Sequence, residues 1–187
     1  MPSPLKEAVL ELESRRKIYN IIESSPGLHF RELQRRAEAA YGSLQYHIEY
    51  LIKKGLVIEK KEDDYSRYFS KDFESTMERE VMALLRQKTV RRILMFFIEK
   101  PNSRNKDVSK YLNISPSTAS WHIHRLLKSG SLSQQTVEGE KSFFLTDADM
   151  ISRLLITYKS TFMDTIVDRF VEVWEKENIK NIRKNKI

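Results

Sequence analysis

The side chains whose types and spacing best suit chemistry lie between residues 115 and 130, in an amphipathic stretch. At about 100° per residue, one side of this stretch collects hydroxyls, an aromatic ring and cations. These outward positions include Ser117, Thr118, Trp121, His124, Arg125 and Lys128. Such a face can donate hydrogen bonds to base edges and pair with phosphates, so it suits the major groove of DNA. We therefore interpret the stretch as a DNA-recognition helix.

Both ends of this helix are marked in the sequence. Ser115 is a good N-cap, and Pro116 suits the first helical position because its missing N–H would be unpaired there. Gly130 can adopt the left-handed conformation that follows many helix C-termini. The opposite side of the helix is apolar and predicted to face a core, with Ala119, Ile123, Leu126 and Leu127.

The same helix occurs twice, 75 residues apart. An ungapped shift superimposes His47 on His122 and Gly55 on Gly130. The register extends from Arg16, which meets Arg91, to Phe69, which meets Phe144. An internal duplication of this kind predicts two copies of one structural unit.

Each copy shows helix, helix, recognition-type helix and β-hairpin, which is the order of a winged helix-turn-helix. The fold class predicted is mainly α with small β-hairpin wings, in two tandem winged helix-turn-helix domains. We expect Ser14 and Thr89 to cap the first helix of each copy, and Thr146–Asp149 to form a capping box. The boundaries expected are 1–13 for an accessory helix, 14–70 for the first domain, 71–88 for a linker helix, 89–145 for the second domain and 146–187 for a long C-terminal amphipathic helix with a basic tail.

Composition narrows the function. The chain of 187 residues has a formal net charge of +7, of which residues 14–70 carry +3 and residues 89–145 carry +5. This favours a polyanionic partner. With no cysteine and no long apolar run, we expect a soluble cytoplasmic protein associated with the nucleoid, with no membrane contact. No catalytic motif or metal-ligand spacing is present, so no enzyme activity, cofactor or metal is expected.

Two segments, His47–Val57 and His122–Gly130, resemble the recognition helix and wing entry of ArsR-like and MarR-like winged-helix regulators. The tandem arrangement is similar to that of archaeal regulators with two winged helices. The resemblance covers both repeats and implies sequence-specific binding of double-stranded DNA, with recognition helices in the major groove and wings near phosphate or the minor groove. Because winged helices also dock proteins, a tandem scaffold of chromosome or basal transcription machinery is the alternative function.

Candidate DNA contacts follow from the helical faces and the resemblance. In the second copy they are Ser117, Thr118, Ser120, Trp121, Arg125, Lys128, Lys106, Lys110 and Lys141. In the first copy they are Ser43, Gln45, Tyr46, Tyr50, Arg31, Arg35 and Arg67. The first copy also carries Glu49 and the acidic run Glu62–Asp64, and lacks a polar cap where Ser115 stands. Acids facing phosphate oppose binding, so we expect the second copy to bind DNA more strongly.

Several residues on these helices also have a purely structural interpretation. His47 and His122 border the apolar side, which favours packing over base contact. Trp121 contacts DNA or packs on its own wing, and the sequence leaves both open. The cations on the helix before each recognition helix are either phosphate contacts or ordinary surface charges.

The C-terminal stretch carries apolar residues every three or four positions, at Ile151, Leu154, Leu155, Tyr158, Phe162, Ile166, Phe170 and Trp174. A stripe of that length exceeds what one small domain needs to cover, so it predicts a homodimer through the C-terminal helix. The alternative is that the helix folds back on Val81, Leu84 and Leu85 and leaves a monomer.

Overall fold

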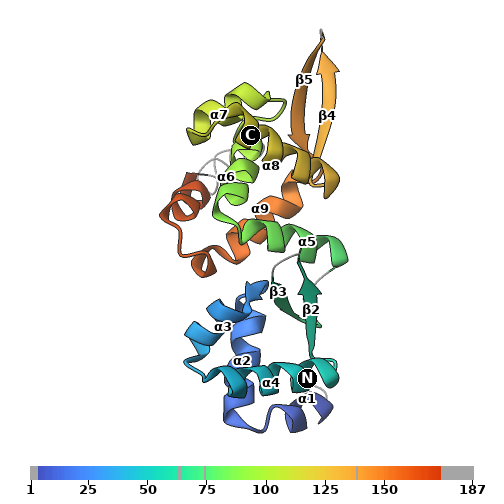
Figure 1. The fold of residues 1–187 in the computed structure, drawn as a ribbon, viewed down its shortest axis with the longest axis vertical. Coiled ribbons are helices and arrows are strands. Elements are labelled where there is room, and N and C mark those ends of the chain that lie inside the picture. The colour runs from blue at the N-terminus through green and yellow to red at the C-terminus, as the bar shows by residue number, and fades with distance from the viewer. Residues whose placement is uncertain (1–3, 63–64, 74, 138, 174–187) are drawn as a thin grey trace, which may run out of the picture. The chain divides into compact units, whose positions relative to one another are not determined.

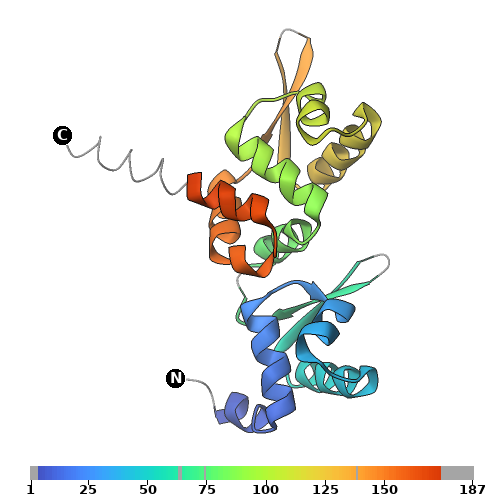
Figure 2. The same ribbon diagram turned by 90° about the vertical axis from the view of Figure 1, so that its left-hand side faces the viewer.

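The computed structural model describes residues 4–62, 65–73, 75–137 and 139–173. The chain divides into two compact units, Met1–Ala83 and Leu84–Ile187. Figures 1 and 2 show the elements of both units.

Unit 1 begins with a short helix and continues with three helices, a short strand and a hairpin (Figure 1). Its elements are α1 (Pro4–Val9), α2 (Glu13–Ser24), β1 (Leu28–His29), α3 (Phe30–Ala37), α4 (Tyr41–Lys53), β2 (Val57–Lys61) and β3 (Ser66–Ser70). The three strands form an antiparallel sheet in the order β1-β3-β2. Helix α5 (Thr76–Leu85) starts in this unit and ends in the next.

The core of unit 1 lies where α2, α3 and α4 meet the hairpin (Figure 2). Ile22 of α2, Leu33 of α3 and Leu44 and Leu51 of α4 have no exposed surface. Val9 of α1 is buried in the same cluster, so the accessory helix belongs to this core.

Unit 2 repeats this order and adds C-terminal helices. Its elements are α6 (Lys88–Glu99), α7 (Asn105–Leu112), α8 (Pro116–Lys128), β4 (Leu132–Val137), β5 (Glu140–Leu145), α9 (Ala148–Thr157) and the 3-10 turn η1 (Lys159–Thr161), and residues 165–173 are helical again. β4 and β5 form an antiparallel hairpin that projects beyond α7 and α8 (Figure 1).

The duplication is visible in the bounds of the elements. The first three helices of the winged fold, α2, α3 and α4, recur as α6, α7 and α8 with both ends shifted by 75 residues. The pairing of Leu28 with Tyr68 recurs as the bridge between Ser103 and Phe143. Positive φ angles recur at the pairs Gly27 and Asn102, Glu38 and Asn113, and Gly55 and Gly130. The predicted fold class, two tandem winged helix-turn-helix domains with small hairpin wings, is confirmed.

The predicted caps are partly wrong. Ser14 and Thr89 lie inside their helices, whose N-caps are Leu12 and Gln87, neither of which accepts a capping hydrogen bond through its side chain. At α9 the cap is Asp147, whose Oδ1 accepts from the Met150 N–H at 2.8 Å. Helix propensity and burial therefore define these starts without the hydroxyl caps that the sequence offered.

The recognition-type helices differ at their N-termini as predicted. Ser115 Oγ accepts a hydrogen bond from the Thr118 N–H at 3.1 Å, and Pro116 follows it. The equivalent N-cap of α4 is Ala40, which has the extended backbone of a cap and no side-chain acceptor. The first turn of α8 therefore has one backbone N–H that is satisfied by its own cap. The equivalent N–H of α4 must find another partner.

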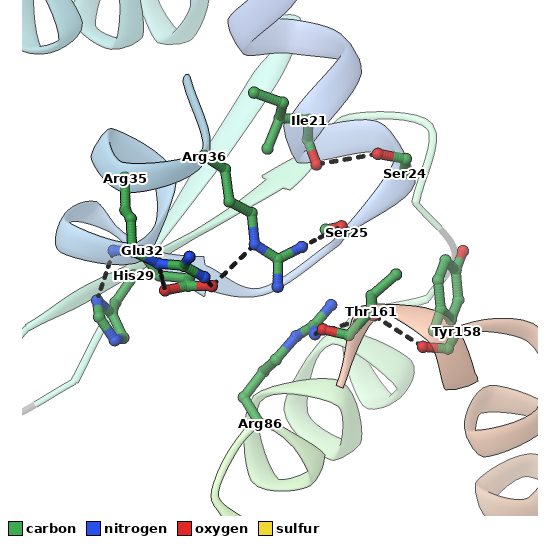
Figure 3. Close-up of polar contacts among 10 residues, drawn as sticks. All are labelled: Ile21, Ser24, Ser25, His29, Glu32, Arg35, Arg36, Arg86, Tyr158 and Thr161. Atoms are coloured by element: carbon green, nitrogen blue, oxygen red, sulfur yellow. Dashed lines mark hydrogen bonds and ion pairs between the residues drawn. The ribbon is translucent and has the colours of Figure 1, made fainter. Parts of the chain in front are cut away.

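The predicted single C-terminal helix is wrong. Helix α9 ends at Thr157, and the chain passes through η1 and a positive φ of 50° at Met163 before the next helix. The turn is held by side chains of the same unit: Arg86 donates to the Thr161 carbonyl at 3.1 Å (Figure 3), and Arg91 donates to Asp164 at 2.5 Å. Arg91 is buried, and a buried guanidinium needs a carboxylate partner. The turn brings Asp164 to Arg91, where it serves as that partner.

The break also changes what the apolar stripe does. Ile151, Leu154, Leu155 and Phe170 are buried within the described part of the chain. Arg86 and Arg91 each place a guanidinium carbon 4.9 Å from the centroid of the Phe162 ring. Trp174 lies outside the described residues. Much of the apolar stripe that was expected to form a dimer interface is therefore buried inside unit 2.

Two histidines occupy equivalent positions on the inner border of α4 and α8. His47 is 6% exposed and His122 is half-buried, in line with a packing role. The Nδ1 atom of each is buried without a hydrogen-bond partner among the described residues. Burial lowers the pKa of both, and the nearby guanidinium of Arg15 or Arg125 lowers it further. The folded chain therefore favours the neutral imidazoles.

A first prediction concerns the caps. Replacing Ser115→Ala should lower the free energy of unfolding of unit 2 by about 1 kcal/mol, because the Thr118 N–H loses its acceptor. The reciprocal Ala40→Ser should raise that of unit 1 by up to about 1 kcal/mol. Chemical denaturation measures both, with the exposed mid-helix Ser120→Ala as the control, expected within about 0.5 kcal/mol of wild type. An unchanged Ala40→Ser chain would show that α4 already satisfies its first N–H groups.

A second prediction concerns pH. Because folding lowers the pKa of His47 and His122, their contribution to stability is complete above the unfolded value of about 6.5 and is lost as pH falls below it. The free energy of unfolding should decline between pH 7 and pH 5. The decline should be smaller in His47→Gln and His122→Gln, measured by urea titration at each pH. A flat profile over this range would contradict the prediction.

Candidate nucleic-acid interface

Helix α8 presents a polar face opposite its buried one. Ala119, Ile123 and Leu126 are at most 3% exposed and anchor the helix to its unit. The outward residues are Ser117, Thr118, Ser120, Trp121, His124 and Lys128, all exposed, with Arg125 half-buried beside them. The rotation of the helix is therefore the one that its periodicity predicts.

The first turn of α8 carries a cluster of hydroxyls. Ser115 Oγ lies 2.8 Å from both Ser117 Oγ and Thr118 Oγ1. All three side chains are exposed, so their remaining hydrogen-bonding capacity faces outward. The helix N-terminus adds a partial positive charge at the same place.

The Trp121 ring contacts two residues of its own helix, α8. Its side chain is 57% exposed, the Arg125 guanidinium carbon is 4.8 Å from its ring centroid, and the His122 ring meets it edge-on. Arg125 also donates through Nη1 to Gln87 Oε1 at 3.3 Å. Arg125 therefore holds the indole ring in position, and more than half of the Trp121 surface stays exposed.

Cations surround this face. Lys106 and Lys110 of α7, Lys128 of α8 and Lys141 of β5 are exposed. Within the ranges that the structure describes, no carboxylate forms an ion pair with these four lysines. Arg104, by contrast, pairs with Glu140 and so ties the start of α7 to the wing. The interface in unit 2 therefore carries positive charge that no described acid offsets by pairing.

The equivalent face of α4 is more acidic and more aromatic. The exposed residues of α4 are Tyr41, Gly42, Ser43, Gln45, Tyr46, Glu49 and Lys53. Gln45 donates through Nε2 to Glu49 Oε1 at 2.9 Å. Tyr50 is half-buried, with the Arg15 guanidinium 3.8 Å and the Lys54 ammonium 5.5 Å from its ring centroid. Tyr50 therefore serves as much to hold these cations as to face a ligand.

Arg67, a predicted DNA contact, is instead an interior residue. Its side chain is 4% exposed, and it donates to Glu62 Oε1 at 2.9 Å and to the Gly27 carbonyl at 2.9 Å. A third bond reaches the Tyr65 hydroxyl at 3.2 Å. The prediction is corrected because Arg67 is buried on β3, where its charge requires internal partners.

The cations of α3 are only partly available. Arg35 forms a two-point pair with Glu32, at 3.0 and 2.6 Å, and Arg36 reaches the same carboxylate at 2.8 Å (Figure 3). The hydrogen bond from Arg35 is the largest influence that lowers the pKa of Glu32, to about 2. Arg31 is exposed on the same helix. In unit 1, then, Arg31 remains the better candidate for a phosphate contact.

The candidate contacts expected from the sequence leave out two residues near this face. His124 lies at the centre of the exposed face of α8, and its 100° spacing already placed it there, although it was not counted as a contact. Gln87 holds Arg125 from 38 positions away, and no local pattern could have shown it. Its counterpart under the 75-residue shift is Leu12, so the repeat carries no signal either.

Other kinds of site find little support in the described ranges. No cluster of three or more His, Asp or Glu side chains there could hold a metal ion. No helix among these residues combines the length and apolar character needed to cross a bilayer.

In a comparison with known proteins, each of the two units matches a protein family. Residues 12–82 match a family described as an N-terminal HTH domain, and residues 86–130 match a family described as winged helix-turn-helix DNA-binding. Over 121 residues, 65% of this chain, the sequence is 29% identical to an uncharacterized HTH-type transcriptional regulator of Methanocaldococcus jannaschii. The aligned region spans 30% of that relative's length. The matched families agree with the repeated fold, and together they identify two tandem winged helix-turn-helix domains in this chain.

Proposed function

We propose that the protein binds double-stranded DNA sequence-specifically and regulates transcription, with α8 in the major groove. The observation that carries this proposal is the exposed face of α8, which is anchored by a buried opposite face and surrounded by lysines without described acidic partners. An α-helix fits the major groove, where base edges differ in their hydrogen-bonding groups.

The side chains divide into two roles. Ser117, Thr118, Ser120, Trp121 and His124 face the bases, because they project from the exposed side of the helix. The lysines at 106, 110, 128 and 141 contact phosphates on either side, and Arg125 positions Trp121. In this arrangement phosphate contacts supply most of the affinity and α8 supplies the sequence preference.

Unit 1 contributes less affinity than unit 2. Glu49 lies at the centre of its exposed face, and Arg35 is engaged by Glu32. These features weaken attraction to phosphate without removing the winged fold.

A regulator with this activity acts in the cytoplasm, at the nucleoid.

A second candidate function, protein docking, is favoured by one observation on unit 1. Tyr41, Tyr46 and Tyr65 are 62%, 59% and 41% exposed, and exposed tyrosines are enriched at protein interfaces. Tandem winged helices that work only as scaffolds would bind partners with little dependence on DNA. The binding experiment below separates the two functions.

The third prediction tests DNA binding. The logarithm of affinity for duplex DNA should fall linearly with the logarithm of salt concentration, with a slope of about −0.9 for each phosphate contact. We expect weaker binding from each of three variants, Lys106→Ala, Lys110→Ala and Lys128→Ala. Each should also make the slope less steep by the contribution of about one phosphate contact. Fluorescence anisotropy at several salt concentrations measures both quantities.

The control for these variants is Lys159→Ala, which removes another exposed lysine of unit 2 from η1, outside α7, α8 and the wing. Its affinity and slope should match those of wild type. Affinity that does not depend on salt, or equal losses from Lys159→Ala and Lys128→Ala, would contradict the proposed interface.

We also propose a homodimer through the C-terminal segment, on a smaller surface than the sequence predicted. Met163, Ile166 and Val173 remain 69%, 37% and 52% exposed there. Ile166 and Val173 lie seven residues apart, on one side of the helix. A two-fold axis would pair this patch with itself and present two copies of α8 to an inverted-repeat DNA site.

The fourth prediction tests this dimer. The double change Ile166→Glu with Val173→Glu should convert a dimer at micromolar concentration into a monomer, because it places charge on the apolar patch. Light scattering measures the mass, and Thr165→Glu with Glu172→Gln is a control on other exposed positions of the same helix. A wild-type chain that is already monomeric at this concentration would rule the dimer out.

A further inference from the structure

The exposed face of α4 carries a hydrogen-bonded pair of polar side chains, Gln45 and Glu49. Shifted by 75 residues, Glu49 corresponds to His124, at the centre of the face that α8 presents. Both helices are anchored by equivalent buried residues, so their faces have the same rotation. Glu49 therefore occupies a position from which a recognition helix contacts base edges.

The pair displays hydrogen-bond acceptors outward. Gln45 uses one N–H to hold Glu49 Oε1 at 2.9 Å, which fixes the carboxylate on the exposed surface. The remaining acceptors are Glu49 Oε2 and the Gln45 amide oxygen. Tyr46, between them in sequence, is 59% exposed and turns its ring against His47. The centre of α4 is therefore an oriented acceptor site.

The backbone beside this pair is open. Gly42 is exposed in the first turn of α4, where Ser117 stands in α8, and a Cβ added there would meet no atom of the protein within 4 Å. Its φ is not positive, so the fold itself does not require glycine at this position. A bare first turn lets another molecule approach α4 closely.

The chemistry of the major groove identifies the matching base. Cytosine presents the N4 amino group as a donor, guanine presents two acceptors at N7 and O6, and thymine presents the O4 acceptor and a methyl group. A carboxylate attracts the first and is repelled by the acceptors of the other two. Adenine offers one donor beside one acceptor and fits less well than cytosine.

We propose that Glu49, positioned by Gln45, selects cytosine in the major groove contacted by α4. This inference rests on the proposed DNA binding and adds the specificity of unit 1 to it. The same negative charge repels phosphates, so unit 1 binds any duplex weakly and discriminates most strongly at one base pair. The competing explanation is that Glu49 is only a repulsive charge on a solvated face.

The experiment compares the base preferences of wild type, Glu49→Gln and Glu59→Gln. Glu59 is an exposed acid on β2, so its change removes the same charge from the same unit without touching the pair. Bound sequences are selected from a random duplex library. Kd values are then measured for the selected duplex and for its single-base variants.

For wild type we expect one position at which cytosine is preferred to guanine by on the order of tenfold. Glu49→Gln should lose most of that preference at that position only, and Gln45→Ala should lose part of it because the carboxylate is no longer held. Glu59→Gln should keep the preference in full.

The proposal is overturned if Glu49→Gln tightens binding to all duplexes equally and keeps every base preference, since Glu49 would then act only through repulsion. It is also overturned if Glu59→Gln loses the same preference. These results leave DNA binding itself intact. If the wild-type chain binds no duplex at low salt, the proposed function fails, and this inference fails with it.

Discussion

The structure depends on the burial of one side of each third helix against the helices before it. Leu44, Ile48 and Leu51 of α4, and Ala119, Ile123 and Leu126 of α8, are at most 3% exposed. Burying a leucine or isoleucine side chain contributes about 1.5 to 3 kcal/mol, so rotating either helix would cost several such terms. The inner face thus determines which residues the outer face can present. Function follows from a constraint on packing.

On this shared scaffold the two units have diverged at their surfaces. Ser115 caps α8 where Ala40 leaves α4 uncapped, and His124 stands where α4 has Glu49. A guanidinium lies on an aromatic ring in both helices, but Arg15 comes from α2 whereas Arg125 belongs to α8 itself. Equivalent geometry therefore supports a basic face in one unit and an acceptor site in the other.

Net charge alone would misplace the cations of this protein. Arg67 and Arg91 are 3% and 4% exposed, and each neutralises a carboxylate while bonding a backbone carbonyl. These guanidiniums stabilise turns and chain crossings, and they add nothing to an interface. The same formal charge on exposed lysines such as Lys106 and Lys110 is available to a polyanion. Burial decides which role each cation has.

The sequence by itself determined the tandem winged helices, the rotation of α4 and α8, the Ser115 cap and most exposed residues of the candidate interface. These features depend on local periodicity and on a repeat that needs no knowledge of distant contacts. Only the tertiary structure decided that Arg67 is internal, that Gln87 holds Arg125 and that the chain turns at Met163. Each of these depends on buried or half-buried polar groups that find partners far away in sequence, and no local pattern records such pairings.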